Sequence, residues 1–193
     1  MTTLAPTFQH PALGPQAVFR TLLDALARPG RPLSITGDVP GPPAPAAPAL
    51  YAAALALIDF ETPVWLDATL QPLAPTLRFH TGAPLVEDPA NAAFALIGNP
   101  LAMPSLAAFA QGTAEHPDRS TTLLLQVTSF APGPWRLTGP GIKAATSFGA
   151  TGLASDFPTQ WRTNHARFPQ GVDLFLTAGH HLAGLPRTTW IEG

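Results

Sequence analysis

Short apolar runs alternate with helical patterns along the whole chain, and this alternation limits the fold more than any other feature of the sequence. The clearest run, TTLLLQV at residues 121–127, is continuous and has β-branched ends, as is typical of a strand buried on both faces. Such a strand needs a covering layer on each side. We therefore predict an α/β fold with three layers, α/β/α, in which helices cover both faces of a mixed sheet.

Helical spacing marks the predicted helices, and the first of them is the best defined. Its apolar residues fall three and four positions apart on one stripe, formed by Phe19, Leu22, Leu23 and Leu26. Arg28-Pro29-Gly30 ends this helix, because a residue before proline avoids helical backbone angles. Helices are predicted over residues 15–27, 47–58, 105–110 (with Ser105 as a possible N-cap) and 155–168. Extended segments are predicted over residues 33–36, 63–67, 77–80, 92–97, 121–127, 135–138, 172–177 and 185–190.

Length and composition narrow the class of protein. A chain of 193 residues fits one domain, and we expect residues 1–193 to form it. Because the sequence has no cysteine, disulfides, thiolate metal sites and cysteine nucleophiles are excluded. The N-terminus has no signal-peptide pattern, and no apolar stretch approaches the roughly 20 residues of a membrane span. The sequence has no block of basic residues of the kind that would indicate nucleic-acid binding. We therefore expect a cytoplasmic protein that binds neither membrane nor nucleic acid.

The sequence carries few charges. Charged residues make up 11% of it, against 46% hydrophobic residues. A surface depleted in charge is typical of the cores of protein interfaces, so contacts with other chains would explain the composition. A bias toward alanine and proline explains it equally well.

Lys143, the one lysine, follows the turn Gly139-Pro140-Gly141. A lysine behind a glycine-rich turn could hold a phosphate or form a Schiff base. An exposed lysine after a tight turn is the simpler interpretation, because the segment matches neither the phosphate-loop nor the dinucleotide motif.

Asp59 and Glu61 could bind a metal or share a proton, but the turn after a helix also explains them. The six histidines show no metal-ligand spacing, so we predict no cofactor and no metal.

Arginines are the stronger candidates for binding. Arginine grips phosphates and carboxylates through two parallel hydrogen bonds. Arg28 lies at a helix end, Arg119 in a turn, and Arg187 beside the hydroxyl of Thr188. We predict these four residues as substrate-binding residues. Salt bridges between subunits would explain the arginines equally well.

Seven segments together resemble the PhnH family, a subunit of the bacterial carbon–phosphorus lyase system for phosphonate breakdown. They occur in the family's order and cover nearly the whole chain. The segments are FRTLLDALARPGR at residues 19–31, LIDFETPVWLD at 57–67, FHTGAP at 79–84, GTAEHPDRSTTLL at 112–124, LTGPGI at 137–142, NHARFPQGVDLFL at 164–176 and LPRTT at 185–189. The chain departs from the family pattern in the proline- and alanine-rich loop at residues 40–48.

The resemblance implies a fold similar to pyridoxal-phosphate-dependent transferases without the cofactor lysine. It also implies a homodimer when isolated, and partners of the PhnG, PhnI and PhnJ types in a core complex. That complex attaches alkylphosphonate to ribose triphosphate from ATP and displaces adenine. The radical cleavage of the carbon–phosphorus bond belongs to another subunit, whose cysteines bind an iron–sulfur cluster. This chain has no cysteine and could not bind such a cluster in that way.

Three functions are consistent with the sequence. The chain is expected to be a structural subunit of the complex. A co-catalytic subunit whose arginines bind phosphates is the second hypothesis. The third is a stand-alone binding protein for phosphonate, nucleotide or ribose phosphate that uses a vestigial cofactor cleft.

Overall fold

A six-stranded mixed sheet forms the centre of the protein, in the computed structural model that describes residues 4–192. The strand order is β1-β8-β7-β4-β3-β2. Strands β2, β3, β4 and β7 are parallel, whereas β8 is antiparallel to β7, and β1 to β8. The strands are β1 (Leu33–Ser34), β2 (Val64–Leu66), β3 (Phe94–Ile97), β4 (Thr122–Gln126), β7 (Asp173–Ala178) and β8 (His181–Leu185).

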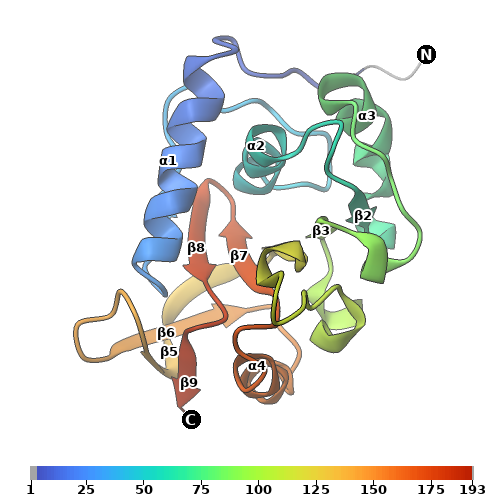
Figure 1. Ribbon diagram of the computed structural model, residues 1–193. Helices are drawn as coiled ribbons and strands as arrows, with labels where there is room; N and C mark the ends of the chain where they lie inside the picture. The colour runs from blue at the N-terminus through green and yellow to red at the C-terminus, as the bar shows by residue number, and fades with distance from the viewer. Residues whose placement is uncertain (1–3, 193) are drawn as a thin grey trace.

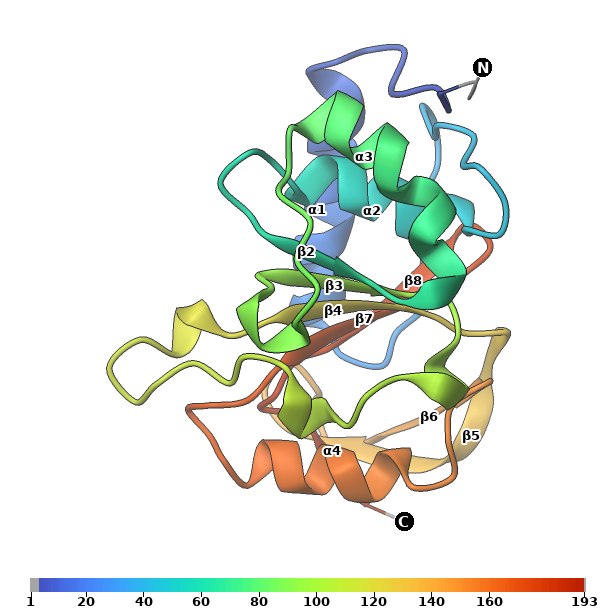
Figure 2. The same ribbon diagram turned by 90° about the vertical axis from the view of Figure 1, so that its right-hand side faces the viewer.

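Three helices cover one face of this sheet, as Figures 1 and 2 show. They are α1 (Leu13–Ala27), α2 (Pro48–Leu57) and α3 (Ala74–Thr81). Helix α2 lies between the other two, and residues 49–54 within it are all 0% exposed. A helix that is apolar on every side must be surrounded by protein, and its alanines let the neighbours approach closely.

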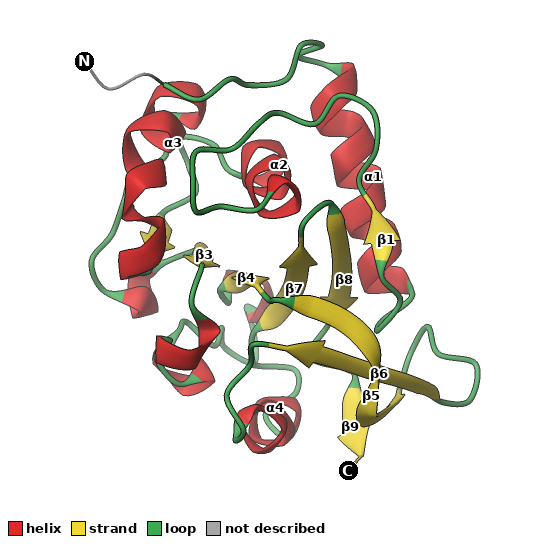
Figure 3. Cartoon of the chain, turned by 180° about the vertical axis from the view of Figure 1, so that it is seen from behind, coloured by secondary structure: helices red, strands yellow, loops and turns green. Residues whose placement is uncertain are grey.

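The opposite face is covered by a helix and a second sheet. Helix α4 (Phe157–His165) lies beside the sheet β6-β5-β9, built from β5 (Ser129–Thr138), β6 (Thr146–Thr151) and β9 (Trp190–Glu192), as Figure 3 shows from behind. Buried Phe157 and Trp161 of α4 pack in this second core. The α/β class and the mixed sheet are therefore confirmed. The expected helical layer on this face is wrong in part, because the small sheet covers some of the area that helices were expected to cover.

Short 3-10 helices lie in the connections: η1 (Ala68–Leu73), η2 (Pro89–Asn91), η3 (Pro100–Ala102), η4 (Leu106–Ala108) and η5 (Pro117–Arg119). The predicted helix at 105–110 is only the single turn of η4, and the side chain of Ser105 makes no capping hydrogen bond. Within residues 4–192, no helix has the length and hydropathy needed to cross a lipid bilayer.

The predicted strand at residues 77–80 is wrong, because these residues lie in α3. Pro75 stands in the first turn of α3, where proline is well tolerated, and Gly82 ends the helix with a left-handed φ of 71°. Leu77 and Leu73 then face the same core. A run of four residues is too short to separate a strand from a helix by its pattern.

The hairpin between β7 and β8 was missed at the sequence level. The predicted extended tail at 185–190 is instead the end of β8, a turn and the first residue of β9. Residues 182–185 are all buried, because β8 is covered by α1 on one face. A Cβ added to Gly184 would lie 2.4 Å from the carbonyl oxygen of Ala25, so the backbones of helix and strand are in direct contact.

Candidate functional site

The seven family-like segments gather at three places in the fold. Residues 112–124, 164–176 and 185–189 meet around Arg187. Residues 19–31 and 137–142 meet below the end of α1, and residues 57–67 and 79–84 meet at the end of α3.

Arg187 stands directly after β8, next to Asp173 at the start of β7. Its backbone N–H donates to Asp173 Oδ1 at 2.7 Å, and its Nε and Nη2 donate to the same carboxylate at 2.5 to 3.2 Å. The Nη1 atom donates to the carbonyl oxygens of Pro117 and Pro169, at 3.0 and 3.1 Å. The Nη2 atom also donates to Ser120 Oγ at 2.5 Å. All five N–H donors of this guanidinium therefore have acceptors within the chain.

This geometry makes Arg187 a structural link. Its side chain is 11% exposed, and it joins the loop before β4, the loop before β7 and the end of β8. Binding a phosphate would require the guanidinium to release an acceptor that it already has. A charge-assisted, two-pronged ion pair of this kind fixes the loops in one arrangement.

Two further side chains hold the same region. Asn164 Oδ1 accepts from the backbone N–H of Val172 at 2.8 Å, and its Nδ2 donates to the carbonyl of Val172 at 2.9 Å. His165 Nδ1 lies 2.9 Å from the carbonyl oxygen of Arg187, so Nδ1 carries the proton in this contact. The ring of His165 also meets Trp190 edge-on, with centroids 5.0 Å apart.

The predicted arginines do not converge on one pocket. Arg187 and Thr188 line a surface hollow of about 370 Å³ together with Asp118, Asp173 and the exposed Phe168. Arg119 is exposed on η5 and does not line this hollow. Arg28 lies in a different hollow, at the end of α1. Two carboxylates beside Arg187 make the first hollow poorly suited to an anion.

The hollow at the end of α1 is basic. It has a volume of about 530 Å³ and is lined by Arg28, Arg31 and Lys143, with the turn at Gly141. No Asp or Glu lines it. Arg28 forms an exposed ion pair with Asp24, as the spacing of four residues predicts. The sequence indicated that Arg28 and Arg31 lie near one helix end, but it did not predict that Lys143 lies beside them.

The third gathering is apolar. Phe60, before β2, and Phe79, on α3, are 71% and 69% exposed. They flank the end of α3, where a Cβ on Gly82 would lie 3.3 Å from the Cβ of Phe60. The nearby pair Asp59 and Glu61 forms a turn, in which Asp59 Oδ1 accepts from the Glu61 N–H at 3.0 Å. Among residues 4–192, no three His, Asp or Glu side chains are grouped in a way that could hold a metal ion.

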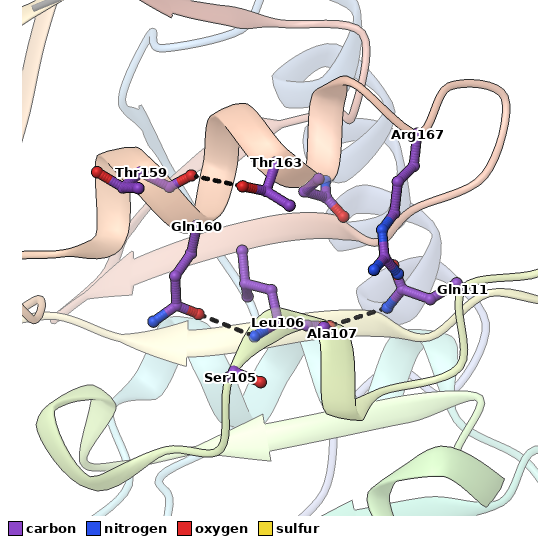
Figure 4. A pocket seen from close by; sticks show the side chains of 9 residues that line it. Ser105, Leu106, Ala107, Gln111, Thr159, Gln160, Thr163 and Arg167 are labelled. Atoms are coloured by element: carbon purple, nitrogen blue, oxygen red, sulfur yellow. Dashed lines mark hydrogen bonds between the residues drawn. The ribbon is translucent and has the colours of Figure 1, made fainter.

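A small pocket of about 140 Å³ lies between α4 and η4 (Figure 4). Its amide side chains point at the backbone: Gln160 Oε1 accepts from the Leu106 N–H, and Gln111 Nε2 donates to the Leu106 carbonyl. Thr163 likewise donates to the carbonyl of Thr159. Of these contacts, the one between Gln160 and Leu106 joins α4 to η4, and the other two brace the segments on which they lie.

Open α/β sheets usually bind ligands at the carboxyl ends of their parallel strands, and at two of these ends, those of β4 and β2, a polar side chain holds the backbone of a nearby loop. Gln126, at the end of β4, accepts from the Ala47 N–H at 2.7 Å and donates to the Pro45 carbonyl at 3.0 Å, which fixes the loop at residues 40–48. Asp67, after β2, accepts from the backbone N–H groups of Gly98 and Asn99 at 3.0 and 2.8 Å. Neither role was predicted, because each depends on a partner distant in sequence.

Comparison with known proteins identifies the relatives of this chain. The family model described as bacterial phosphonate metabolism protein (PhnH) matches residues 6–192. The alpha-D-ribose 1-methylphosphonate 5-triphosphate synthase subunit PhnH of Rhizobium meliloti (strain 1021) is 42% identical over 188 residues, covering 96% of this chain and 94% of that protein. HtxG of Stutzerimonas stutzeri, named as a C-P lyase subunit protein, is 42% identical over 82 residues, which is 42% of each chain.

The family model covers nearly all of the described residues, and the segments it spans include all three gatherings. The resemblance noted in the sequence is therefore confirmed. This chain belongs to the family of bacterial phosphonate metabolism proteins known as PhnH.

Proposed function

We propose that this chain is a subunit of a carbon–phosphorus lyase core complex, which supports the transfer of alkylphosphonate to the ribose triphosphate of ATP. The observation that carries this proposal is the 42% identity to the Rhizobium meliloti synthase subunit over 96% of the chain. Identity of this extent over almost the full length preserves the fold and the surfaces that depend on it. The same proposal places the protein in the cytoplasm, where ATP is available.

A structural role within that complex fits the chemistry of the chain better than a catalytic role. The sequence has no cysteine nucleophile, and the best-placed arginine, Arg187, directs all its donors at protein acceptors. His165 and Asp173 are likewise engaged in holding loops. Of the residues predicted to bind substrate, Arg187 thus serves the fold.

The partners of this chain are proposed to be PhnG-, PhnI- and PhnJ-type subunits, and a second copy of the chain when it is isolated. Large apolar side chains on the surface support the proposal that this chain binds other protein chains. Phe60 and Phe79 are both more than two-thirds exposed, and α1 presents Phe19 and Leu23 at 43% and 52% exposure. Grouped apolar side chains at a surface are typical of interaction sites.

The similarity to pyridoxal-phosphate-dependent transferases is proposed at the level of the fold only. The one lysine, Lys143, lies in the β5–β6 loop beside the end of α1. The carboxyl ends of the parallel strands carry Gln126 and Asp67, both engaged with backbone. No lysine therefore stands at those strand ends to form a Schiff base with a cofactor.

Co-purification tests the proposal. The tagged chain should be co-expressed with PhnG-, PhnI- and PhnJ-type subunits from the same source and applied to a size-exclusion column. We expect one assembly that contains every subunit and that loses transferase activity when this chain is left out. Elution of this chain apart from a complete and active assembly of the others would contradict the proposal.

A further inference from the structure

The basic hollow at the end of α1 joins two segments that lie more than a hundred residues apart in sequence. Arg28 and Arg31 come from the segment that follows α1, and Lys143 comes from the β5–β6 loop. Figures 1 and 3 show this loop projecting beneath the C-terminal end of α1. Three cations and no carboxylate therefore line one hollow of about 530 Å³.

Backbone contacts hold the two walls of this hollow against each other. A Cβ on Gly141 would lie 2.1 Å from the carbonyl oxygen of Ala27, and Gly141 has a left-handed φ of 82°. On the other wall, a Cβ on Gly30 would lie 2.4 Å from Leu137 Cδ1, and the Gly30 N–H donates to the Gly184 carbonyl at 3.0 Å. The cations are therefore brought together by the fold of the free chain, before any ligand arrives.

Only one of the three cations, Arg28, has a negatively charged partner in its own segment. Arg28 pairs with Asp24 and lies near the C-terminal carbonyls of α1, which attract positive charge. Arg31 and Lys143 make no hydrogen bond or ion pair with any residue between 4 and 192. Two unpaired cations held beside a third raise the local positive potential and favour an anion with several charges.

We propose that this hollow binds the triphosphate group of a ribosyl triphosphate or a nucleotide, with Arg31 and Lys143 as its main ligands. The choice of a triphosphate rests on the proposed function, whereas the anion site itself rests on the geometry. Arginine can hold two phosphate oxygens at once, and lysine contributes a point charge. Arg31 and Lys143 add two positive charges to that of Arg28, and the hollow holds about 530 Å³, so a chain of phosphates suits it better than a single phosphate.

Isothermal titration calorimetry on the full chain tests the site. Inorganic triphosphate, ATP and ribose 5-phosphate serve as probes at low salt. We expect triphosphate and ATP to bind more tightly than ribose 5-phosphate, and binding to weaken as salt is added. The double variant Arg31→Gln/Lys143→Gln should lose about a hundredfold in affinity, roughly tenfold for each charged hydrogen-bond donor. Arg20→Gln, on the exposed surface of α1 outside the hollow, is the matched control and should bind normally.

The charge-preserving double variant Arg31→Lys/Lys143→Arg guards against loss of fold as an explanation. It should retain most of the affinity, and all variants should melt within a few degrees of the wild type. Equal affinity for ATP and inorganic triphosphate would identify the triphosphate alone as the recognised group, and tighter binding of ATP would identify a nucleotide. The proposal is overturned if the wild type binds no triphosphate at low salt, or if the Gln double variant binds it normally.

The same proteins separate this inference from the proposed function. If the chain joins the partner subunits but binds no triphosphate, the subunit role stands and the anion site is wrong. If it binds triphosphate through Arg31 and Lys143 but never joins the partners, the site stands and the subunit role is wrong.

Discussion

At the scale of single residues, Arg187 illustrates how a residue chosen for binding can serve the fold. Its guanidinium joins Asp173, Ser120 and two backbone carbonyls that come from three separate loops. Loss of one partner of a largely buried ion pair leaves the other charge without compensation, and this is more costly than the pair itself is stabilising.

Replacement of Arg187 by alanine should therefore lower the free energy of unfolding by about 3 kcal/mol. Arg136→Ala is the matched control, because Arg136 forms an ion pair with Glu192 in which both side chains are over 40% exposed. That control should cost less than about 1 kcal/mol. Urea denaturation measures both. A stable Arg187→Ala protein that had lost ligand affinity would instead favour a binding role for Arg187.

Tyr51 is the one tyrosine, and it is fully buried in α2. Its hydroxyl donates to the carbonyl of Pro6 at 3.0 Å, which ties the N-terminal segment to the helical layer. Burial raises the pKa of Tyr51 to about 12. Because the pKa is raised in the fold, the stability linked to this proton is complete below the unfolded value of about 10 and is lost as the pH rises toward 12.

Alkaline titration followed by tyrosinate absorbance should therefore show a single transition near pH 12. Circular dichroism recorded in parallel distinguishes ionisation in the fold from ionisation on unfolding. Tyr51→Phe removes the absorbance change and serves as the blank. A midpoint near 10 with an intact fold would contradict the burial of this hydroxyl.

At the scale of elements, α1 shows how a predicted helix can be right while only Leu22 and Leu26 of its predicted apolar stripe pack against the core. The predicted stripe contained Phe19, Leu22, Leu23 and Leu26. In the structure the residues directed inward are Gly14, Val18, Leu22 and Ala25, and Phe19 and Leu23 are exposed. Small residues face the sheet because α1 lies directly on the backbone of Gly184 in β8.

Substitution of Gly184 by alanine should force α1 away from the sheet. The added Cβ would lie 2.4 Å from the Ala25 carbonyl oxygen, closer than any relaxed contact, so we expect a loss of about 1–3 kcal/mol in unfolding free energy. Gly41→Ala is the control, since a Cβ there meets nothing within 4 Å. Equal stability of the two variants would mean that α1 is not packed as described.

At the scale of the whole molecule, the family-like segments mark two kinds of surface. One is the basic hollow below α1, and the other is the apolar end of α3 with Phe60 and Phe79. Exposed aromatic residues are frequent at the centres of protein interfaces, where their truncation removes much of the binding energy. The end of α3 is therefore the surface we expect to contact a partner subunit.

The double variant Phe60→Ser/Phe79→Ser should weaken assembly with the partner subunits by at least about tenfold, since each of these truncations typically costs more than 1 kcal/mol. Its melting temperature should stay at or above that of the wild type, because both side chains are exposed. Leu101→Ser, at 66% exposure on η3, is the matched control. Size-exclusion chromatography of the co-expressed subunits measures the effect, and normal assembly of the double variant would assign the interface elsewhere.

The sequence by itself determined the α/β class, the strong central strands and the first two helices, because these depend on local periodicity and on proline and glycine at their ends. It also determined the family, through seven segments in order. It excluded cysteine chemistry outright, since the residue type is absent.

Only the tertiary structure decided which residues meet. Arg187 meets Asp173 through the β7–β8 hairpin, and Gln126 fixes a loop about eighty residues away. Lys143 lines the same hollow as Arg31, which lies more than a hundred residues earlier in the sequence. The small sheet that replaces part of a helical layer likewise depends on the pairing of β5 with the distant β9. Such contacts are set by the path of the whole chain, so no pattern within a short window of sequence contains them.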